Sequence, residues 1–289
     1  MGCRIPPRIA LVIDATISAF GGAGVTFCGV DLMIRLKLLA AAIAVAMVAS
    51  VGHARADEWQ FSVAPYLWAV SLDGEQTVKG RASDIDVSFL DIIEESDSIF
   101  ALQAHFELHN GTWGVFFDPT FMALTMDATV GPIDVDIEFD YWLVEFGAVY
   151  RVASWPQEGG ADIDLELLAG GRYTSLDIDI DLTVRRFGKT VGGNKKWIDP
   201  FVGARTLIPL TEGVNLLLRG DVGGFGVGSD FTYNLVGTVG WDMTVFGNDA
   251  TLIAGYRILY QDYEDGSGAN RFAYDITTHG PIIGMNFRF

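Results

Sequence analysis

The sequence predicts an all-β fold: a transmembrane, up-and-down antiparallel β-barrel of about ten strands. Three observations lead to it. Apolar and polar residues alternate along most of residues 57–289, turn residues separate the alternating runs, and the chain ends on an alternating segment that stops at Phe289. Alternation with a period of two is the pattern of a strand with two unlike faces. No segment after Ala56 has the long apolar run of a membrane helix.

The N-terminal region predicts export. Residues 33–56 begin with Arg35 and Lys37, continue as an apolar run and end on Ala-Arg-Ala. This is the order of parts in a secretory signal peptide, and the run is shorter than the ~18–20 residues that span a bilayer. We therefore divide the chain into a spurious N-terminal extension (1–32), a cleaved signal peptide and a barrel (57–289), and expect the barrel in the outer membrane.

Composition excludes several functions. Both cysteines, Cys3 and Cys28, precede the barrel, so the barrel has neither a thiol nucleophile nor thiolate metal ligands. The whole chain has 19 Lys and Arg against 37 Asp and Glu. Residues 1–56 contain five of the basic and two of the acidic residues, which leaves the barrel with a net charge of −21. So acidic a chain repels nucleic acid.

The alternating runs set the expected strands. They lie at 59–71, 99–109, 112–127, 133–152, 162–183, 196–209, 213–223, 230–245, 250–263 and 271–289. An even number of strands returns both termini to one side, and the connections 72–98, 184–195 and 264–270 then face outside. Several runs exceed the ~9–11 residues that cross a bilayer, so the sheet should project beyond it.

Charged residues recur on the face that we expect to point inward. The candidate lumen residues are Arg151, Arg172, Arg205, Arg219, Arg257, Arg288, Glu107, Glu145, Glu166, Asp199, Asp221 and Asp242. Buried charges need partners, which favours a network that fills the lumen. The alternative is a charged constriction that selects solutes. About eight strands make a filled barrel and ~16–18 an open porin, so ten strands favour filling.

Two further segments carry local signals. Acidic residues alternate with apolar ones at the start of the fourth run (Asp134, Asp136, Glu138) and at the end of the fifth, at 177–181. We interpret them as solvated strands, since no calcium-loop glycine follows. Residues 85–98 place apolar side chains at helical spacing, which predicts a short amphipathic helix, either a packed loop or a plug at the mouth.

Histidine is the remaining catalytic candidate. Only His105, His109 and His279 lie in the barrel, and none stands in a Ser–His–Asp pattern. We expect no catalytic residue, no cofactor and no metal site, and we predict that the protein is not an enzyme.

Five segments carry a resemblance to a known family: VAPYLWAVSLDG (63–74), DVSF (86–89), NGTWGVFFD (110–118), WIDPFVGAR (197–205) and RGDVGGFGVGSDFT (219–232). They resemble small, largely uncharacterised proteobacterial outer-membrane barrels. The resemblance implies a monomeric up-and-down barrel and no agreed activity. The terminal Phe, with apolar residues at every second position before it, resembles the signal that barrel-assembly machinery reads.

Together these features predict an integral outer-membrane protein with a structural or surface-interacting role and a largely filled, charged lumen. The alternative is a narrow porin-like channel for cations or small polar solutes, and a surface enzyme is the third class. The expected partners are outer-membrane lipid and lipopolysaccharide, with barrel-assembly machinery during biogenesis and no nucleic acid.

Overall fold

The computed structural model describes residues 59–130, 133–157, 161–184, 187–245 and 247–289. The predicted N-terminal extension (1–32) and signal peptide (33–56) lie outside the described residues. The strands are β1 (Gln60–Trp68), β2 (Ser71–Val78), β3 (Arg81–Val87), β4 (Ser98–His109), β5 (Trp113–Val130), β6 (Ile133–Trp155), β7 (Ile163–Val184), β8 (Phe187–Thr211), β9 (Val214–Gly224), β10 (Phe231–Val245), β11 (Asn248–Asp265) and β12 (Phe272–Arg288). The helices are α3 (Phe89–Glu95) and η1 (Gly268–Asn270).

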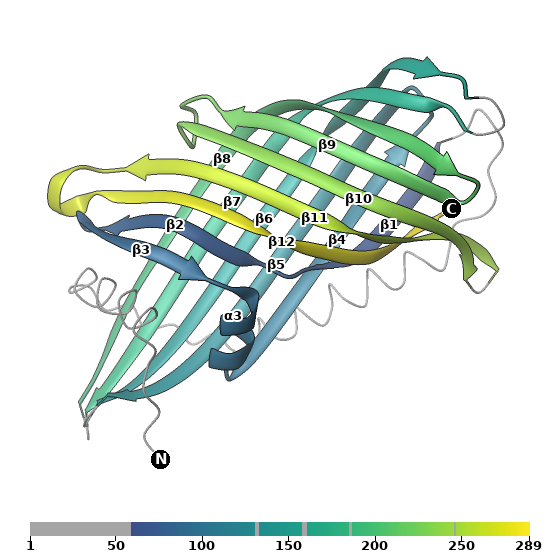
Figure 1. Cartoon of the computed structure of the whole chain (residues 1–289). Helices are drawn as coiled ribbons and strands as arrows, with labels where there is room; N and C mark the ends of the chain where they lie inside the picture. The colour runs from purple at the N-terminus through teal and green to yellow at the C-terminus, as the bar shows by residue number, and fades with distance from the viewer. Residues whose placement is uncertain (1–58, 131–132, 158–160, 185–186, 246) are drawn as a thin grey trace.

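Ten of these strands form a closed antiparallel barrel (Figure 1). The wall runs from β1 through β4 and then in chain order to β12, which pairs with β1. Antiparallel neighbours joined by short turns give an up-and-down barrel, and the closed circle satisfies the backbone hydrogen bonds of its outermost strands. The predicted ten-stranded all-β barrel is confirmed.

The two ends of the described chain meet at the barrel seam. Ser62 pairs with Arg288 in the β1–β12 ladder, and Phe61 and Phe289 exchange backbone hydrogen bonds of 3.2 and 2.9 Å. Their rings stack with centroids 6.3 Å apart. We call this side of the barrel the terminal end and the opposite side the far end.

The prediction that residues 72–98 form a loop was wrong, because this segment folds into a β-hairpin and a helix. β2 continues the course of β1 along β12, and β3 folds back onto β2. The turn between them is Lys79-Gly80, with φ of 49° and 74°. Such two-residue turns with positive φ match the twist of paired strands.

The amphipathic helix predicted within 85–98 is shorter than expected. Its first residues, 85–87, belong to β3, and α3 begins after Ser88. The Ser88 hydroxyl accepts from the Asp91 backbone N–H at 3.2 Å, while the Asp91 carboxylate accepts from the Ser88 backbone N–H at 2.9 Å. This reciprocal capping box fixes the start of the helix.

Of the two other predicted outer connections, one was placed wrongly and one is confirmed. Residues 187–195 of the expected 184–195 connection are the first part of β8 and pair with β7. The connection predicted at 264–270 is confirmed, since β11 ends at Asp265, β12 begins at Phe272 and the short helix η1 lies between them. β6, β7 and β8 are 23, 22 and 25 residues long, and together with β5, which pairs with β6 up to its first residue, they project well past the other strands (Figure 1).

The barrel wall has a gap at its far end. β1 pairs with β4 only as far as Pro65 and Ala104. Beyond that point β4 residues 98–103 pair with β5, and in the described chain no ladder joins them to β3 on the other side. The helix α3 connects β3 to β4 at this gap (Figure 1).

The polarity of the wall reverses along its long strands. Near the terminal end, the outward residues of β6 are Trp142, Phe146 and Tyr150, each 39–43 % exposed, while Glu145 is buried inside. Nearer the far end, the outward positions are acidic and the inward positions are apolar. A strand keeps its alternation over its whole length, so the reversal marks a change of surroundings outside the wall.

The predicted acidic stripes lie side by side on this outer surface. Asp136, Glu138 and Asp140 of β6 stand opposite Asp181, Asp179 and Asp177 of β7. Burial and the neighbouring carboxylates, chiefly those of Asp177 and Asp181, raise the pKa of Asp179 above its ordinary range. Like charges directly opposite each other destabilise paired strands.

We expect Asp179→Asn to stabilise the far half of β6 and β7 by about 0.5 kcal/mol at pH 7. Because the folded-state pKa of Asp179 is raised, its unfavourable contribution disappears as the pH falls through that pKa. The advantage of the variant should therefore shrink between pH 7 and pH 4. Amide hydrogen-exchange protection of the two strands measures it. An advantage that is constant with pH would contradict the electrostatic origin.

Candidate functional site

Five charged side chains meet inside the barrel and form a network that we call the charged plug; all but Arg219 are buried. They are Glu145, Arg172, Arg219, Asp221 and Arg257. Arg172 contacts Glu145 at 2.7 Å and Asp221 at 2.6 Å. Arg257 reaches the same Glu145 oxygen at 2.8 Å, and Arg219 lies 3.0 Å from its other oxygen. The Glu145 carboxylate is therefore shared by three guanidinium groups from three strands.

Neutral side chains complete the plug. Asn234 donates to Asp221 at 2.9 Å and accepts from Arg257 at 3.0 Å, and Thr232 accepts from Arg172 at 3.1 Å. Buried charges are tolerated when their remaining donors and acceptors are satisfied in this way. The plug is thus a connected network rather than a set of separate ion pairs.

Aromatic rings lie against the guanidinium groups. The centroid of Phe201 is 5.0 Å from the Arg172 guanidinium, and that of Trp68 is 4.7 Å from the Arg257 guanidinium. A guanidinium over a ring face gains cation–π attraction when water is excluded. Gly170 makes room for this packing, since a Cβ there would lie 2.9 Å from the Phe201 ring.

A second charged cluster lies nearer the terminal end. Arg205 forms a two-pronged contact with Glu107, with one bond of 2.6 Å, and also contacts Glu166. His105 bridges Glu107 at 3.2 Å and Asp118 at 2.9 Å. Paired guanidinium–carboxylate bonds of this geometry are directional and strong, so this cluster adds a second charged layer across the lumen.

The structure distributes the twelve predicted lumen charges over several groups. Five form the plug and three (Glu107, Glu166, Arg205) the second cluster. Asp199 accepts instead from the Trp197 indole at 3.1 Å and the Ser229 backbone at 2.6 Å. Arg151 pairs with Asp164 at 3.0 Å, and Arg288 pairs with Asp242 at 3.0 Å in a partly exposed position.

The three histidines have separate surroundings. His105 belongs to the second cluster, and His109 accepts from the Gly111 backbone N–H at the turn after β4. His279 lies on the outer surface, 2.6 Å from both the Tyr256 hydroxyl and the Asp73 carboxylate. These three side chains connect β2, β12 and β11. The hydroxyl beside the histidine belongs to tyrosine, whereas a Ser–His–Asp triad has a serine there.

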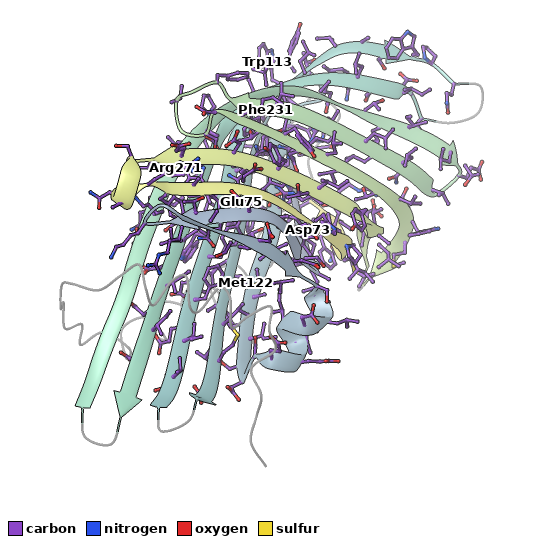
Figure 2. All side chains as sticks on the ribbon, turned by 60° about the vertical axis from the view of Figure 1, so that its left-hand side comes forward. Asp73, Glu75, Trp113, Met122, Phe231 and Arg271 are labelled. Carbon is purple, nitrogen blue, oxygen red and sulfur yellow. The ribbon has the colours of Figure 1, made fainter. Side chains whose placement is uncertain are left out.

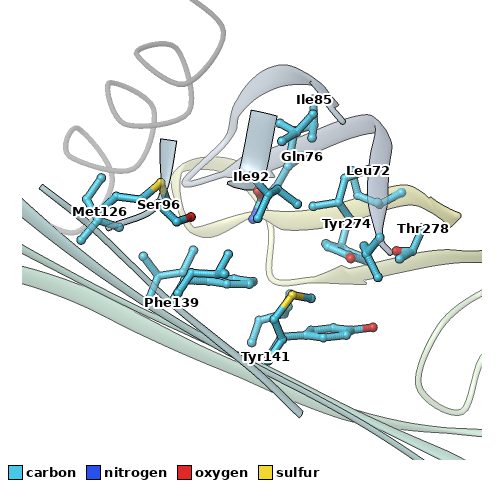
Figure 3. A pocket seen from close by; sticks show the side chains of 18 of the residues that line it. Leu72, Gln76, Ile85, Ile92, Ser96, Met126, Phe139, Tyr141, Tyr274 and Thr278 are labelled. Atoms are coloured by element: carbon cyan, nitrogen blue, oxygen red, sulfur yellow. The ribbon is translucent and has the colours of Figure 1, made fainter. Parts of the chain in front are cut away.

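Beyond the plug, the far half of the barrel encloses an apolar cavity of about 170 Å³ (Figure 3). One wall comes from β5, β6 and β7 and consists of Met122, Leu124, Met126, Ile137, Phe139, Tyr141, Leu176, Ile178 and Ile180. The facing wall comes from β2, β3, α3, β12 and the residues next to β2 and α3, and it consists of Val70, Leu72, Gln76, Ile85, Val87, Ile92, Ser96, Tyr274, Ile276 and Thr278. We call this space the apolar cavity.

The boundary between plug and cavity is a layer of buried side chains. Trp68 covers Arg257 on one side and packs in the same apolar cluster as Tyr141 and Leu143 on the other. Leu143 is one inward position from Glu145 and is fully buried. The cavity therefore has a floor of buried, uncharged side chains that lies between it and the charges of the plug.

The sequence interpretation missed the cavity although its signal was present. Glu145 was placed on the inward face, and a period of two puts Tyr141, Phe139 and Ile137 on the same face. Because a polar lumen was expected, only charged residues were predicted to lie inside the barrel. The acidic residues between them were noticed, but the apolar residues that alternate with them line the cavity.

Two kinds of feature are not found in the described residues. No three His, Cys, Asp or Glu side chains there are grouped so that they could hold a metal ion. In the same part of the chain, no helix combines the length and the apolar character needed to cross a membrane.

Comparisons with known proteins give only remote similarities. No family model and no curated protein matches the chain. Among solved structures, the Ail protein of Yersinia pestis is 13% identical, with a TM-score of 0.34 over 80% of this chain and 98% of Ail. The translocator domain of NalP from Neisseria meningitidis is 14% identical, with a TM-score of 0.33 over 90% of this chain and 98% of the domain. Similarities this remote carry no argument about function.

We expect Arg172→Leu to lower the free energy of unfolding by about 3–5 kcal/mol, because it leaves Glu145 and Asp221 buried with fewer cationic partners. Arg288→Leu is the matched control: it breaks a partly exposed ion pair and should change stability by less than about 1 kcal/mol. Urea unfolding of the barrel in detergent measures both. Equal effects of the two substitutions would contradict the assigned role of the plug.

Proposed function

We propose that the protein is a non-conducting outer-membrane barrel that carries a folded β-structure on the outer surface of the cell. The observation that carries this proposal is the charged plug, in which Glu145, Arg172, Asp221 and Arg257 are each 3 % exposed or less. A solute path needs continuous water, and paired charges packed against aromatic rings exclude it from the barrel centre.

The outside of the terminal half supports a membrane location. Exposed aliphatic and aromatic residues cover it, and Trp113 and Phe231 lie on its surface (Figure 2). Exposed aromatic residues border the covered zone, with Trp113 and Tyr150 at one edge, 4.4 Å apart, and Trp142 at the other. Along β6, Trp142 and Tyr150 are about 26 Å apart. This arrangement fits an apolar band between two aromatic girdles.

The same features suggest an orientation. Turns at the terminal end are short, whereas the far end carries the long strands and the β2–β3 hairpin (Figure 1). In outer-membrane barrels short turns face the periplasm and longer segments face outside. The far half would then stand in water among lipopolysaccharide, where an acidic outer face is well solvated. A role in contacts at the cell surface follows from that placement.

We expect no steady conductance from the protein, purified from the outer membrane of an expressing Gram-negative host, in a planar bilayer. The double variant Glu145→Ser with Arg172→Ser removes one buried cation and one buried anion from the plug. It should open a water path and give a steady conductance that the unaltered protein lacks.

The matched control is Glu264→Ser with Arg271→Ser, which removes an exposed pair of the same two charges with contacts of 2.9 and 3.0 Å. It should stay silent. Heat-modifiable gel mobility checks that each variant is folded. Steady, ion-selective conductance of the unaltered protein would overturn the proposal and favour a narrow channel.

A further inference from the structure

The apolar cavity has the size and lining of a small-molecule site. Its surface is formed almost wholly by aliphatic, aromatic and thioether side chains from six strands and one helix. At about 170 Å³ it is slightly larger than an engineered apolar cavity of about 150 Å³ that stays dry and binds benzene. A six-carbon apolar group therefore fits it.

Polar atoms without partners lie at the inner end of this cavity. Tyr141 lines the cavity and is 4 % exposed, and its hydroxyl has no hydrogen-bond partner in the described chain. Close by in the same part of the barrel, the Trp68 indole N–H and the Gln103 side-chain amide N are equally buried and unpartnered. Buried donors of this kind are normally satisfied. A ligand oxygen at the cavity floor would satisfy the Tyr141 hydroxyl.

Acidic residues lie beside the cavity, on and just after the helix that contributes Ile92 to its lining. α3 and the residue pair after it carry Asp91, Glu94, Glu95 and Asp97, and α3 has no basic residue in its last turn. Burial and the carboxylates of Asp91 and Glu94 raise the pKa of Glu95 above its ordinary range. An anionic ligand would meet like charges here, so the ligand should carry no negative charge.

The gap in the wall lies beside the cavity, because Ile92 of α3 and Ser96, between α3 and β4, belong to its lining. Ile92 of α3 lines the cavity, whereas Leu90 and Ile93 of the same helix are 65 % and 46 % exposed. On the other edge of the gap, Ile99 and Phe100 of β4 are each 42 % exposed. Apolar side chains thus continue from the outer surface to the cavity, which is the surface a hydrocarbon group can follow.

We propose that the apolar cavity binds an uncharged molecule made of a hydrocarbon chain with one oxygen at its inner end, taken up through the gap between α3 and β4. The hydrocarbon chain would pack against the isoleucines of both walls and the methionines of β5, which line the cavity (Figure 3), and its oxygen would bond to the Tyr141 hydroxyl. This binding site does not depend on whether the plug conducts.

The test uses the protein in lipid nanodiscs with its isoleucine δ-methyl groups labelled for NMR, and the probes hexan-1-ol, hexane and hexanoate at pH 8. Ile92, Ile137, Ile178 and Ile180 report on the cavity, and Ile198 and Ile283, which face outward, report on the lipid. We expect saturable shifts of the cavity methyls with hexan-1-ol, weaker binding of hexane and none of hexanoate.

Three variants locate the site. Met122→Trp fills the cavity and should abolish saturable binding, while Ala123→Trp places the same ring on the outward side of β5 and should leave it unchanged. Tyr141→Phe should weaken hexan-1-ol binding by about fivefold, the net value of one buried hydrogen bond, and leave hexane binding unchanged.

Several outcomes would overturn the proposal. Non-saturable shifts of the same size at Ile198 and Ile283 would mean partition into lipid. Retained binding in Met122→Trp would place the site elsewhere, and hexanoate binding as tight as that of hexan-1-ol would refute the uncharged ligand class. Equal loss of hexane and hexan-1-ol binding in Tyr141→Phe would refute the hydrogen bond.

Discussion

The Glu145 carboxylate accepts from or contacts three guanidinium groups inside the barrel, and the geometry around it follows from the need to keep all of them paired. Each arginine comes from a different strand, so the strands must hold their register for any one pair to form. Glycine at position 170 lets the rings that cover the guanidinium groups approach. The interaction therefore couples wall, packing and lumen, and its loss at one point exposes unpaired charge at several others.

The plug also divides one continuous sheet between two environments. On its terminal side the wall is apolar outside and charged inside, as suits a barrel in lipid. On its far side the wall is acidic outside and apolar inside, as suits a protein in water. β6 and β7 pass through both zones without interruption, and only the assignment of polar and apolar residues to the two faces changes. The apolar cavity is the interior of the second zone.

Alternation alone was enough to predict the barrel, because ten wall strands each keep a period of two over many residues. The β2–β3 hairpin was not predicted from the sequence, because its short strands contain four acidic residues and resemble a solvated loop. These residues are Asp73, Glu75, Asp84 and Asp86. The start of β8 is rich in Gly and Lys and is held by its pairing with β7. The partners within the lumen could not be predicted at all: Glu107 and Arg205 are 98 residues apart in sequence, and only closure of the wall brings them together.

The seam between β1 and β12 joins the first and the last strand of the described chain, with Phe61 bonded to Phe289. During folding the two edges of the wall cannot meet until β12 is in place beside β1. Until then the sheet is open, with two unpaired edges that could recruit other strands. The sheet stays open while the chain between β1 and β12 folds, so partial unfolding of β12 would return the protein to the open form, which is the form most prone to aggregate.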